Sequence, residues 1–265
     1  MSPHPADTSP ARHLELVAID VAGLAAAEVR AAAGVASVRR TKSSPTDVVT
    51  ATDEESEALI RAELLARCPG STIVGEELDD AVGASNVGWI VDPIDGTVNF
   101  LYDLPVVSVS IAATIDGLVV AGAVADVHRR EVFSATRGEG ARRDGETIIA
   151  SGIDRLDQAL VGTGFAYAAD LRAAQARVLH RLLPACRDIR CMGSAALNLC
   201  WVGCGRLDAY FERDLKVYDH AAGALIAAEG GAAVEAAEAD DLDLTVAAAR
   251  PIAAPLNAIL RDSPD

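Results

Sequence analysis

The chain has 265 residues, of which 51% are hydrophobic and 4% aromatic, and it carries a formal net charge of −16. A chain of this length and apolar content can bury a sizeable core, as one large domain or two small ones. A protein this acidic should repel nucleic acid and anionic membranes, so neither is expected as a direct partner. If the substrate is an anion, bound cations are the groups expected to offset the negative field locally.

Cysteine usage and hydropathy predict a protein of the reducing cytoplasm. The cysteine count is odd, no Cys-x-x-Cys pair is present and no signal sequence is visible, which disfavours a disulfide framework. Cys200 and Cys204 would share one face of an apolar helix, where core packing is favoured over zinc binding. No apolar run approaches the roughly 18 residues that a membrane-spanning helix needs.

The beginning of the chain predicts a tail and then a helix. Residues 1–11, rich in Pro, Ser and Ala, are expected to be a disordered tail, and residues 12–265 a single domain. Apolar residues at helical spacing predict a helix from about Leu14 to Ala33. Gly34 is expected to end that helix.

The next segment predicts a polar loop and a second helix. Lys42 lies in the loop, where a solvated surface charge and a position close to a phosphate are equally consistent with the sequence. A β-like run at 48–50 leads to Thr52, which is expected to open a helix in a capping box with Glu55. That helix is expected to end at Arg67.

The middle of the chain predicts an antiparallel meander. Apolar runs at 106–115, 118–125 and 131–135 read as strands, and Asp116-Gly117 is a strong hairpin signal. A meander of this kind argues against a doubly wound parallel sheet. The remaining expected elements are strands at 159–162, 189–192 and 206–212, helices at 171–183, 195–202, 221–228 and 253–261, and a solvated acidic loop at 235–243.

The stretch at 89–100 carries the strongest chemical signal. A short apolar strand runs into an acidic turn that holds Asp92 and Asp95. Pro93 is expected to end the strand because it lacks a backbone N–H, and Thr97 is expected to cap a short helix. Carboxylate oxygens are preferred ligands of Mg2+, and free N–H groups at a helix start favour a phosphate. The alternative is a capped turn whose acids face water.

Two further acidic sites repeat this arrangement. Glu76 and Glu77 follow an apolar strand at 72–74, and the acids can meet those at 92–95 if the two strands are neighbours. Asp219 stands at the start of another expected helix, where it can be an ordinary N-cap or can face a site.

Taken in order, three elements resemble the inositol monophosphatase family of Mg2+-dependent, lithium-sensitive phosphatases. They are Gly-Glu-Glu at 75–77, Asp-Pro-Ile-Asp-Gly-Thr at 92–97 and Asp-x-Ala-Ala-Gly at 219–223. The resemblance extends over residues 12–262, nearly the whole chain. It implies an α+β fold, the layered α-β-α-β-α sandwich of the inositol monophosphatase and fructose-1,6-bisphosphatase type, usually assembled as a homodimer.

The resemblance implies a metal site built from these acids. Glu76, Asp92 and the backbone carbonyl of Ile94 would hold one Mg2+ ion. Asp92, Asp95 and Asp219 would hold a second. A third, loosely held ion would contact Glu76 through water, which gives two or three ions for each active site.

The resemblance also implies how the substrate is bound. Gly96 and Thr97 would offer N–H groups to the phosphate, and Ala195 would line the substrate pocket. Glu212 would bind an inositol hydroxyl, and Asp219 would contact the substrate as well as the metal.

The sequence departs from the family pattern in two places. Tyr218 stands where the family usually has Trp, a change expected to matter for packing more than for chemistry. The segment 162–170 differs from the animal enzymes where a Ser can touch substrate. This departure concerns which sugar is recognised and leaves the phosphate chemistry intact.

The implied reaction is hydrolysis of a phosphate monoester, myo-inositol 1-phosphate in the first place, by direct attack of a metal-activated water. Glu76 and Thr97 would orient and deprotonate that water, and Asp92 would bridge both metals. Histidinol phosphate and fructose 1,6-bisphosphate are the alternative substrates.

Two other kinds of protein were weighed against this interpretation. A haloacid-dehalogenase-type phosphatase is disfavoured because its two acids are two apart, whereas Asp92 and Asp95 are three apart with a proline between them. A regulatory binding protein on the same fold is the alternative from another class, since some bacterial members of the family are thought to act on the transcription machinery.

Overall fold

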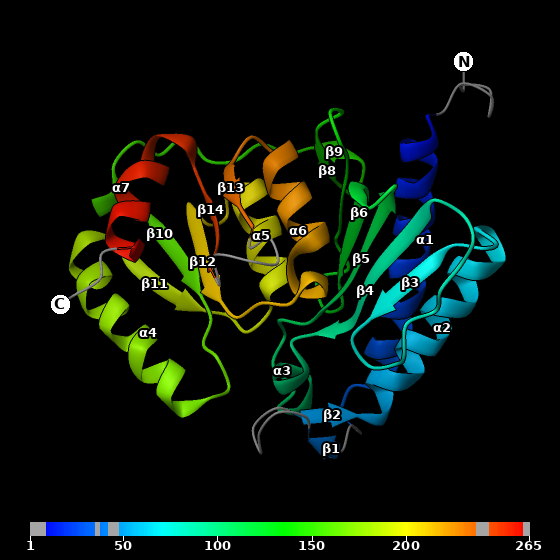
Figure 1. Cartoon of the computed structure of the whole chain (residues 1–265). Helices are drawn as coiled ribbons and strands as arrows, with labels where there is room; N and C mark the ends of the chain where they lie inside the picture. The colour runs from blue at the N-terminus through cyan, green and yellow to red at the C-terminus, as the bar shows by residue number, and fades with distance from the viewer. Residues whose placement is uncertain (1–8, 35–37, 42–47, 237–243, 262–265) are drawn as a thin grey trace.

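The computed structural model describes residues 9–34, 38–41, 48–236 and 244–261. Figure 1 shows five layers of secondary structure. Helices α1 (Pro10–Ala31) and α2 (Ala51–Arg67) cover the outer face of a seven-stranded sheet, and α5 (Ala195–Gly203) and α6 (Val217–Glu229) lie between that sheet and a five-stranded one. Helices α4 (Ala169–Leu182) and α7 (Arg250–Arg261) cover the far side. The predicted α-β-α-β-α sandwich is confirmed.

The seven-stranded sheet contains the predicted meander. Its strand order is β3-β4-β5-β6-β7-β8-β9, and every neighbouring pair is antiparallel except β3 and β4. The strands are β3 (Thr72–Gly75), β4 (Val87–Asp95), β5 (Ser108–Ile115), β6 (Leu118–Asp126), β7 (Val132–Thr136), β8 (Ala141–Arg143) and β9 (Glu146–Thr147).

The five-stranded sheet is mixed, with the strand order β11-β10-β12-β14-β13. Strand β10 is parallel to both of its neighbours, whereas β14 is antiparallel to both of its own. The strands are β10 (Leu160–Thr163), β11 (Asp188–Cys191), β12 (Ala209–Arg213), β13 (Ala233–Glu235) and β14 (Leu244–Ala248). Strands β13 and β14 were not predicted; they lie on either side of the acidic run at 235–243, where only a solvated loop was expected.

The remaining elements are short. They are the hairpin β1 (Val38–Thr41) and β2 (Val48–Thr50), helix α3 (Thr97–Leu101), and two 3₁₀ turns at Leu156–Gln158 and Leu183–Ala185. Lys42, most of the predicted tail and residues 237–243 of the predicted acidic loop lie outside the described residues.

The starts of α1 and α2 differ from the prediction because other side chains cap them. Helix α1 begins at Pro10, four residues before the predicted start, where the hydroxyl of Ser9 accepts the N–H of Arg12 at 3.1 Å. In α2 the capping box joins Thr50 to Asp53, whose carboxylate accepts the N–H of Thr50 at 2.9 Å. The predicted capping box at Thr52 is therefore wrong by two residues.

Strand β4 does not end at Pro93, as predicted, but continues to Asp95. Along β4, Asp92 pairs with Ser110 and Asp95 with Ser108, so three steps on β4 match two steps on β5. The extra residue forms a bulge, in which Pro93 needs no ladder N–H. The bulge lies between Asp92 and Asp95 and sets the position of both acids at the end of the strand.

No helix in the described part of the chain has both the length and the apolar content to cross a membrane. The apolar side chains of α1 instead face the seven-stranded sheet, where Ala18, Val21 and Ala25 are fully buried. Small alanines let this helix lie close to β5 and β6. The core therefore forms between layers, and the chemistry-bearing residues collect at the strand ends.

Candidate active site

The ends of β3 and β4 bring the first acids together. These strands are parallel neighbours, so Glu76 and Asp92, which follow paired residues, lie at the same edge of the sheet. Burial raises the pKa of Asp92 well above its usual range, and the carboxylates of Glu76, Asp95 and Asp219 raise it further. Such mutual repulsion requires the groups to lie close together. All the predicted metal-binding carboxylates therefore converge on one place.

Asp219 reaches this place from the first turn of α6. It is not the N-cap, as one reading of the sequence had it, but the third residue of the helix. One carboxylate oxygen accepts the N–H of Lys216 at 2.6 Å, which completes the helix start. Burial and the Glu76 carboxylate raise the pKa of Asp219. Tyr218 lies in the same surroundings, since burial and Glu76 also raise the pKa of its phenol.

Asp95 is held by donors from two directions. Its carboxylate accepts the hydroxyl of Ser108 at 3.0 Å and the N–H groups of Ala195 and Ala196 at 3.0 and 2.9 Å. The hydroxyl of Ser194, the N-cap of α5, also donates to it. Burial raises the pKa of Asp95, and these hydrogen bonds oppose the rise. Asp95 thus joins the seven-stranded sheet to α5 and places Ala195 beside the acids.

Thr97 makes a contact that the sequence analysis missed. It is the first residue of α3 rather than its cap, and its hydroxyl lies 3.0 Å from Asp53 Oδ1 and 3.1 Å from the carbonyl oxygen of Ile94. Asp53 is fully buried. A Thr-x-x-Asp capping pattern was available at 50–53, but nothing local indicated a partner 44 residues away.

Glycine at the start of α3 allows a close approach to the segment before α5. Gly96 has φ +101°, and a Cβ there would lie 2.9 Å from the carbonyl oxygen of Val106 and 3.0 Å from that of Gly193. Asn99 fixes this approach by donating to the carbonyl oxygens of Val106 at 2.8 Å and Met192 at 2.7 Å. The start of α3 therefore packs against the segment that leads into α5, the helix that begins at Ala195.

Glu212 lies at the end of β12, across from these acids. The hydroxyl of Tyr210 donates to its carboxylate. Burial raises the pKa of Glu212 to about 7, against the effect of that hydrogen bond, and Asp95 adds to the rise. A Cβ on Gly164 would lie 2.0 Å from Glu212 Oε2, so only glycine leaves room for the carboxylate.

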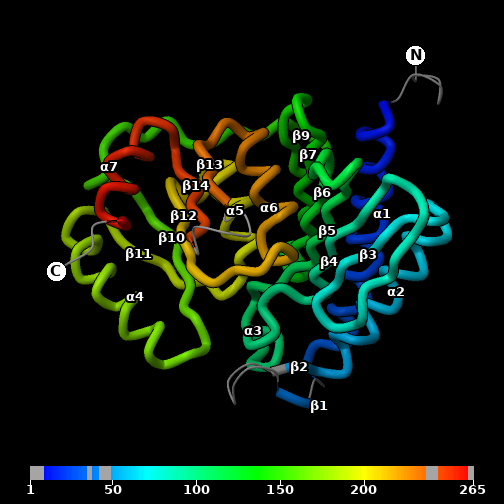
Figure 2. The backbone as a smooth tube through the Cα atoms, in the orientation of Figure 1, coloured from blue at the N-terminus to red at the C-terminus, as the bar shows by residue number. Residues whose placement is uncertain are grey.

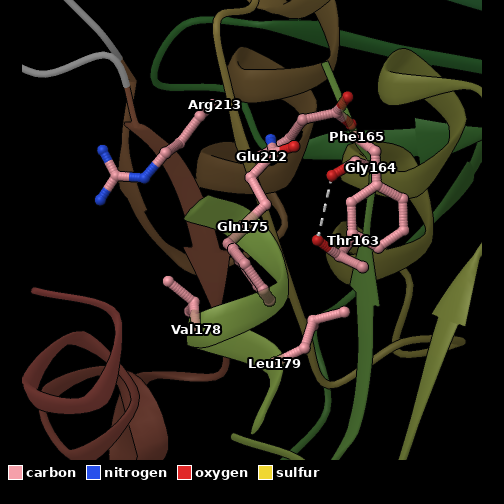
Figure 3. Close-up of a pocket in the computed structure, with 9 residues that line it drawn as sticks. Thr163, Gly164, Phe165, Gln175, Val178, Leu179, Glu212 and Arg213 are labelled. Atoms are coloured by element: carbon pink, nitrogen blue, oxygen red, sulfur yellow. Dashed lines mark hydrogen bonds between the residues drawn. The ribbon is translucent and has the colours of Figure 1, made fainter. Parts of the chain in front are cut away.

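A small hollow borders Glu212 on the side of α4. Figure 3 shows it between the end of β10, helix α4 and the end of β12. Phe165 lines it beside the end of β10, and Val178 and Leu179 line it from α4. The residues at 163–165 come from the segment in which the sequence departs from the animal enzymes.

Comparison with known proteins decides what this site belongs to. The model of the family described as "Inositol monophosphatase family" matches residues 11–263. The chain belongs to the inositol monophosphatase family. The family indicates a phosphatase that acts on small phosphate esters.

Relatives in the family carry two kinds of name. The "Inositol-1-monophosphatase SuhB" of Mycobacterium tuberculosis is 46% identical over 267 residues, covering 92% of this chain and 91% of the relative. The solved structure "Mycobacterium tuberculosis SuhB" aligns with TM-score 0.81 and 44% identity, covering 96% of this chain and 98% of that one. The "Nus factor SuhB" of Escherichia coli is 40% identical over 190 residues, or 71% of each chain.

Divalent metal ions are general in this family, and the donor set fits them by its chemistry. The ligand atoms are all oxygens, and the charged groups that raise the pKa of Asp92 are carboxylates, whose repulsion a cation would relieve. As placed, however, no group of three or more His, Cys, Asp or Glu side chains within the described residues could hold a metal ion. The carboxylates of Asp92, Asp95 and Asp219 each accept backbone N–H groups.

Proposed function

We propose that this chain is a Mg2+-dependent phosphatase that hydrolyses myo-inositol 1-phosphate to inositol and phosphate. The observation that carries the proposal is the convergence of Glu76, Asp92, Asp95 and Asp219, whose charges act together on the pKa of Asp92. The name of the M. tuberculosis relative supports the choice of substrate. The related esters histidinol phosphate and fructose 1,6-bisphosphate are the alternatives.

The proposed metal-binding residues are those that the resemblance to the family implies. Glu76, Asp92 and the carbonyl oxygen of Ile94 would hold one Mg2+, and Asp92, Asp95 and Asp219 a second, with a third contacting Glu76 through water. When bound, Mg2+ supplies a lowered pKa for the attacking water and positive charge for the phosphoryl group. Asp92 belongs to both sets and should be the most damaging single loss.

The protein's own groups would bind the phosphate and move the proton. N–H groups of Gly96 and Thr97, at the start of α3, have no partner inside the helix and would donate to phosphate oxygens. The Thr97 hydroxyl would take a proton from the attacking water while it passes its own to Asp53, 3.0 Å away. Glu76 would orient the same water.

The sugar would be recognised by Glu212, across the site from the other acids. Glu212, with a pKa of about 7, can accept a hydrogen bond from an inositol hydroxyl when ionised or donate one when protonated. Ala195 and Asp219 would border the leaving oxygen. The proposal also includes a homodimer, inhibition by lithium and residence in a reducing cytoplasm.

A substrate panel tests the proposal. Phosphate release would be measured with myo-inositol 1-phosphate, histidinol phosphate and fructose 1,6-bisphosphate, each in Mg2+. We expect kcat/KM for the inositol ester to exceed the others by about tenfold or more, because the proposal places a hydroxyl of the inositol ring on Glu212. A clear preference for either of the other esters would contradict the assignment of inositol phosphate as substrate, but the protein would still be a phosphatase.

A regulatory binding role is the second candidate, favoured by the name "Nus factor" of the E. coli relative. It would be tested by a pull-down with RNA polymerase subunits, using wild-type protein and the Asp92→Asn variant. Retention of polymerase by both proteins would establish a role independent of catalysis. If neither protein retains polymerase and the wild type hydrolyses a phosphate ester, only the enzymatic function would be supported.

A further inference from the structure

A buried carboxylate on α2 holds the turn that follows β3. Glu57 is fully buried, and its Oε2 accepts the N–H of Glu77 at 2.7 Å while its Oε1 accepts the N–H of Leu78 at 3.3 Å. Figure 2 shows α2 running along the outer face of the seven-stranded sheet, beside β3 and β4. Helix α2 thus supplies hydrogen-bond acceptors to the turn that follows β3, the edge strand of that sheet.

Arg61, one turn further along α2, completes this arrangement. Its guanidinium lies 2.8 Å (Nε) and 2.6 Å (Nη2) from Glu57 Oε1, and its Nη2 donates to the carbonyl oxygen of Leu78 at 3.0 Å. A Cβ on Gly75 would lie 2.0 Å from Glu57 Oε1 and 2.8 Å from Arg61 Nη2. The turn therefore packs directly on the Glu57–Arg61 pair, with glycine at the point of contact.

Glu76 is the residue of this turn that faces the acid cluster. Its neighbour Glu77 is nearly fully buried and pairs with Arg40 of β1 at 2.9 Å. Glu76 instead follows Gly75, which pairs with Val91 of β4, so Glu76 and Asp92 lie beside each other at the end of the two parallel strands. Like charges at close range repel, so an unrestrained turn after an edge strand would relax by moving Glu76 away from the cluster.

We propose that Glu57 and Arg61 are positioning residues, which hold the backbone of the turn so that Glu76 stays at the metal site. The proposal rests on the proposed function, because it assigns Glu76 to Mg2+. The pair neutralises its own charge and binds the N–H groups of Glu77 and Leu78 and the carbonyl oxygen of Leu78, so it resists the repulsion that Glu76 meets. Glu57 and Arg61 contact neither substrate nor metal themselves.

The test compares Glu57→Gln with a matched control on the same helix. Glu63→Gln removes the charge of another Glu–Arg pair of the same spacing, with Arg67; the two side chains are 37% and 32% exposed. For each protein, Mg2+ binding would be measured by calorimetry, activation of phosphate release by Mg2+ titration, and amide hydrogen exchange over residues 72–82. Thermal melting would establish that each variant is folded.

We expect Glu57→Gln to weaken Mg2+ binding by about tenfold. The same factor should appear in the Mg2+ concentration for half-maximal activity, with KM for the ester at saturating Mg2+ within about twofold of wild type. Exchange at the Glu77 and Leu78 amides should accelerate in Glu57→Gln, whereas Glu63→Gln should match wild type throughout. If Glu57→Gln fails to fold, Arg61→Lys, which cannot reach both partners, should show the same changes.

Unchanged Mg2+ binding in a folded Glu57→Gln, or in a folded Arg61→Lys, would overturn the inference while leaving the proposed function in place. A wild-type protein that neither binds Mg2+ nor releases phosphate would overturn the proposed function, and the inference with it. The two failures are therefore distinguishable from the wild-type measurement alone.

Discussion

The hydroxyl of Thr97 lies 3.0 Å from the carboxylate of Asp53, and the other oxygen of that carboxylate caps α2 through the N–H of Thr50. One buried acid thus fixes the start of α2 and meets the first residue of α3. In the proposed reaction, Asp53 would receive the proton that the Thr97 hydroxyl gives up.

Replacing Asp53 by Asn should therefore separate proton transfer from binding. We expect kcat to fall by about a hundredfold or more, because an amide cannot take up the proton, while KM changes little. The weakened cap should cost about 1 kcal/mol of stability, measurable by urea unfolding. Thr97→Ser keeps the hydroxyl and should retain most turnover, whereas Thr97→Val should resemble Asp53→Asn. Full kcat in Asp53→Asn would remove it from the proton path.

Asp92→Asn and Asp95→Asn should both abolish nearly all turnover but differ in stability. Asp92 is one of several repelling acids, so its neutralisation should leave the metal-free protein as stable as wild type or more stable. Asp95 accepts hydrogen bonds from Ser108 and from the start of α5. The amide NH2 of Asn is itself a donor, so it would face these donors without forming a hydrogen bond. We expect a loss of about 1–3 kcal/mol for Asp95→Asn in urea unfolding.

Near-normal turnover in a folded Asp92→Asn would contradict the metal assignment. An Asp95→Asn protein as stable as wild type would show that Asp95 does not anchor α5. Ser194→Ala is a useful intermediate case, since it removes one donor to Asp95 and the cap of α5 while keeping the carboxylate.

The metal-free protein should lose stability as pH rises from about 4.5 to about 7. The pKa of Glu212 rises from 4.5 to about 7 on folding, chiefly through burial, and the pKa values of Asp92 and Asp219 also rise. In this window the folded state binds more protons than the unfolded state, so unfolding becomes easier with increasing pH. Glu212 alone contributes a change of about 3 kcal/mol.

Melting temperatures in EDTA across this pH range check the direction, and Glu212→Gln should flatten the curve. Mg2+ should raise the melting temperature more at pH 7.5 than at pH 5, because protons compete with it for the carboxylates. Stability that rises with pH in EDTA would show that the acids are not buried together.

The Glu212→Gln variant should also test whether the site recognises an inositol hydroxyl. An amide offers a fixed donor and acceptor where the carboxyl group can supply either, so KM for myo-inositol 1-phosphate should rise by about tenfold. Hydrolysis of p-nitrophenyl phosphate, which has no sugar hydroxyl, should keep its KM. An equal effect on both esters would indicate that Glu212 supports the site without recognising the sugar.

The acids of the site could be predicted because their signals are local. An apolar run followed by carboxylates marks both β3 and β4, and the structure brings Glu76 and Asp92 to one edge. The partners could not be predicted in the same way. Ser194 is 99 residues from Asp95, and no local pattern links them. Glu57 lies 20 residues from Glu77, whose N–H it accepts, and nothing local in the sequence marks that contact.

Elements were missed where local rules compete with tertiary context. Pro93 normally argues against a continuing strand, but a bulge removes the need for its N–H. Strand β14 is short and buried throughout, so it lacks the alternation that marks a half-exposed strand. Asp219 and Thr97 were expected at N-caps, and each lies inside its helix because a preceding residue starts the helix earlier.

Phosphate release from myo-inositol 1-phosphate, measured with Mg2+ and then after EDTA, tests the central claim most directly. We expect rapid release in Mg2+, loss of release in EDTA, and none from Asp92→Asn in either condition. Release that survives EDTA, or that persists in folded Asp92→Asn, would contradict the account, because the converging acids would then not be the source of catalysis.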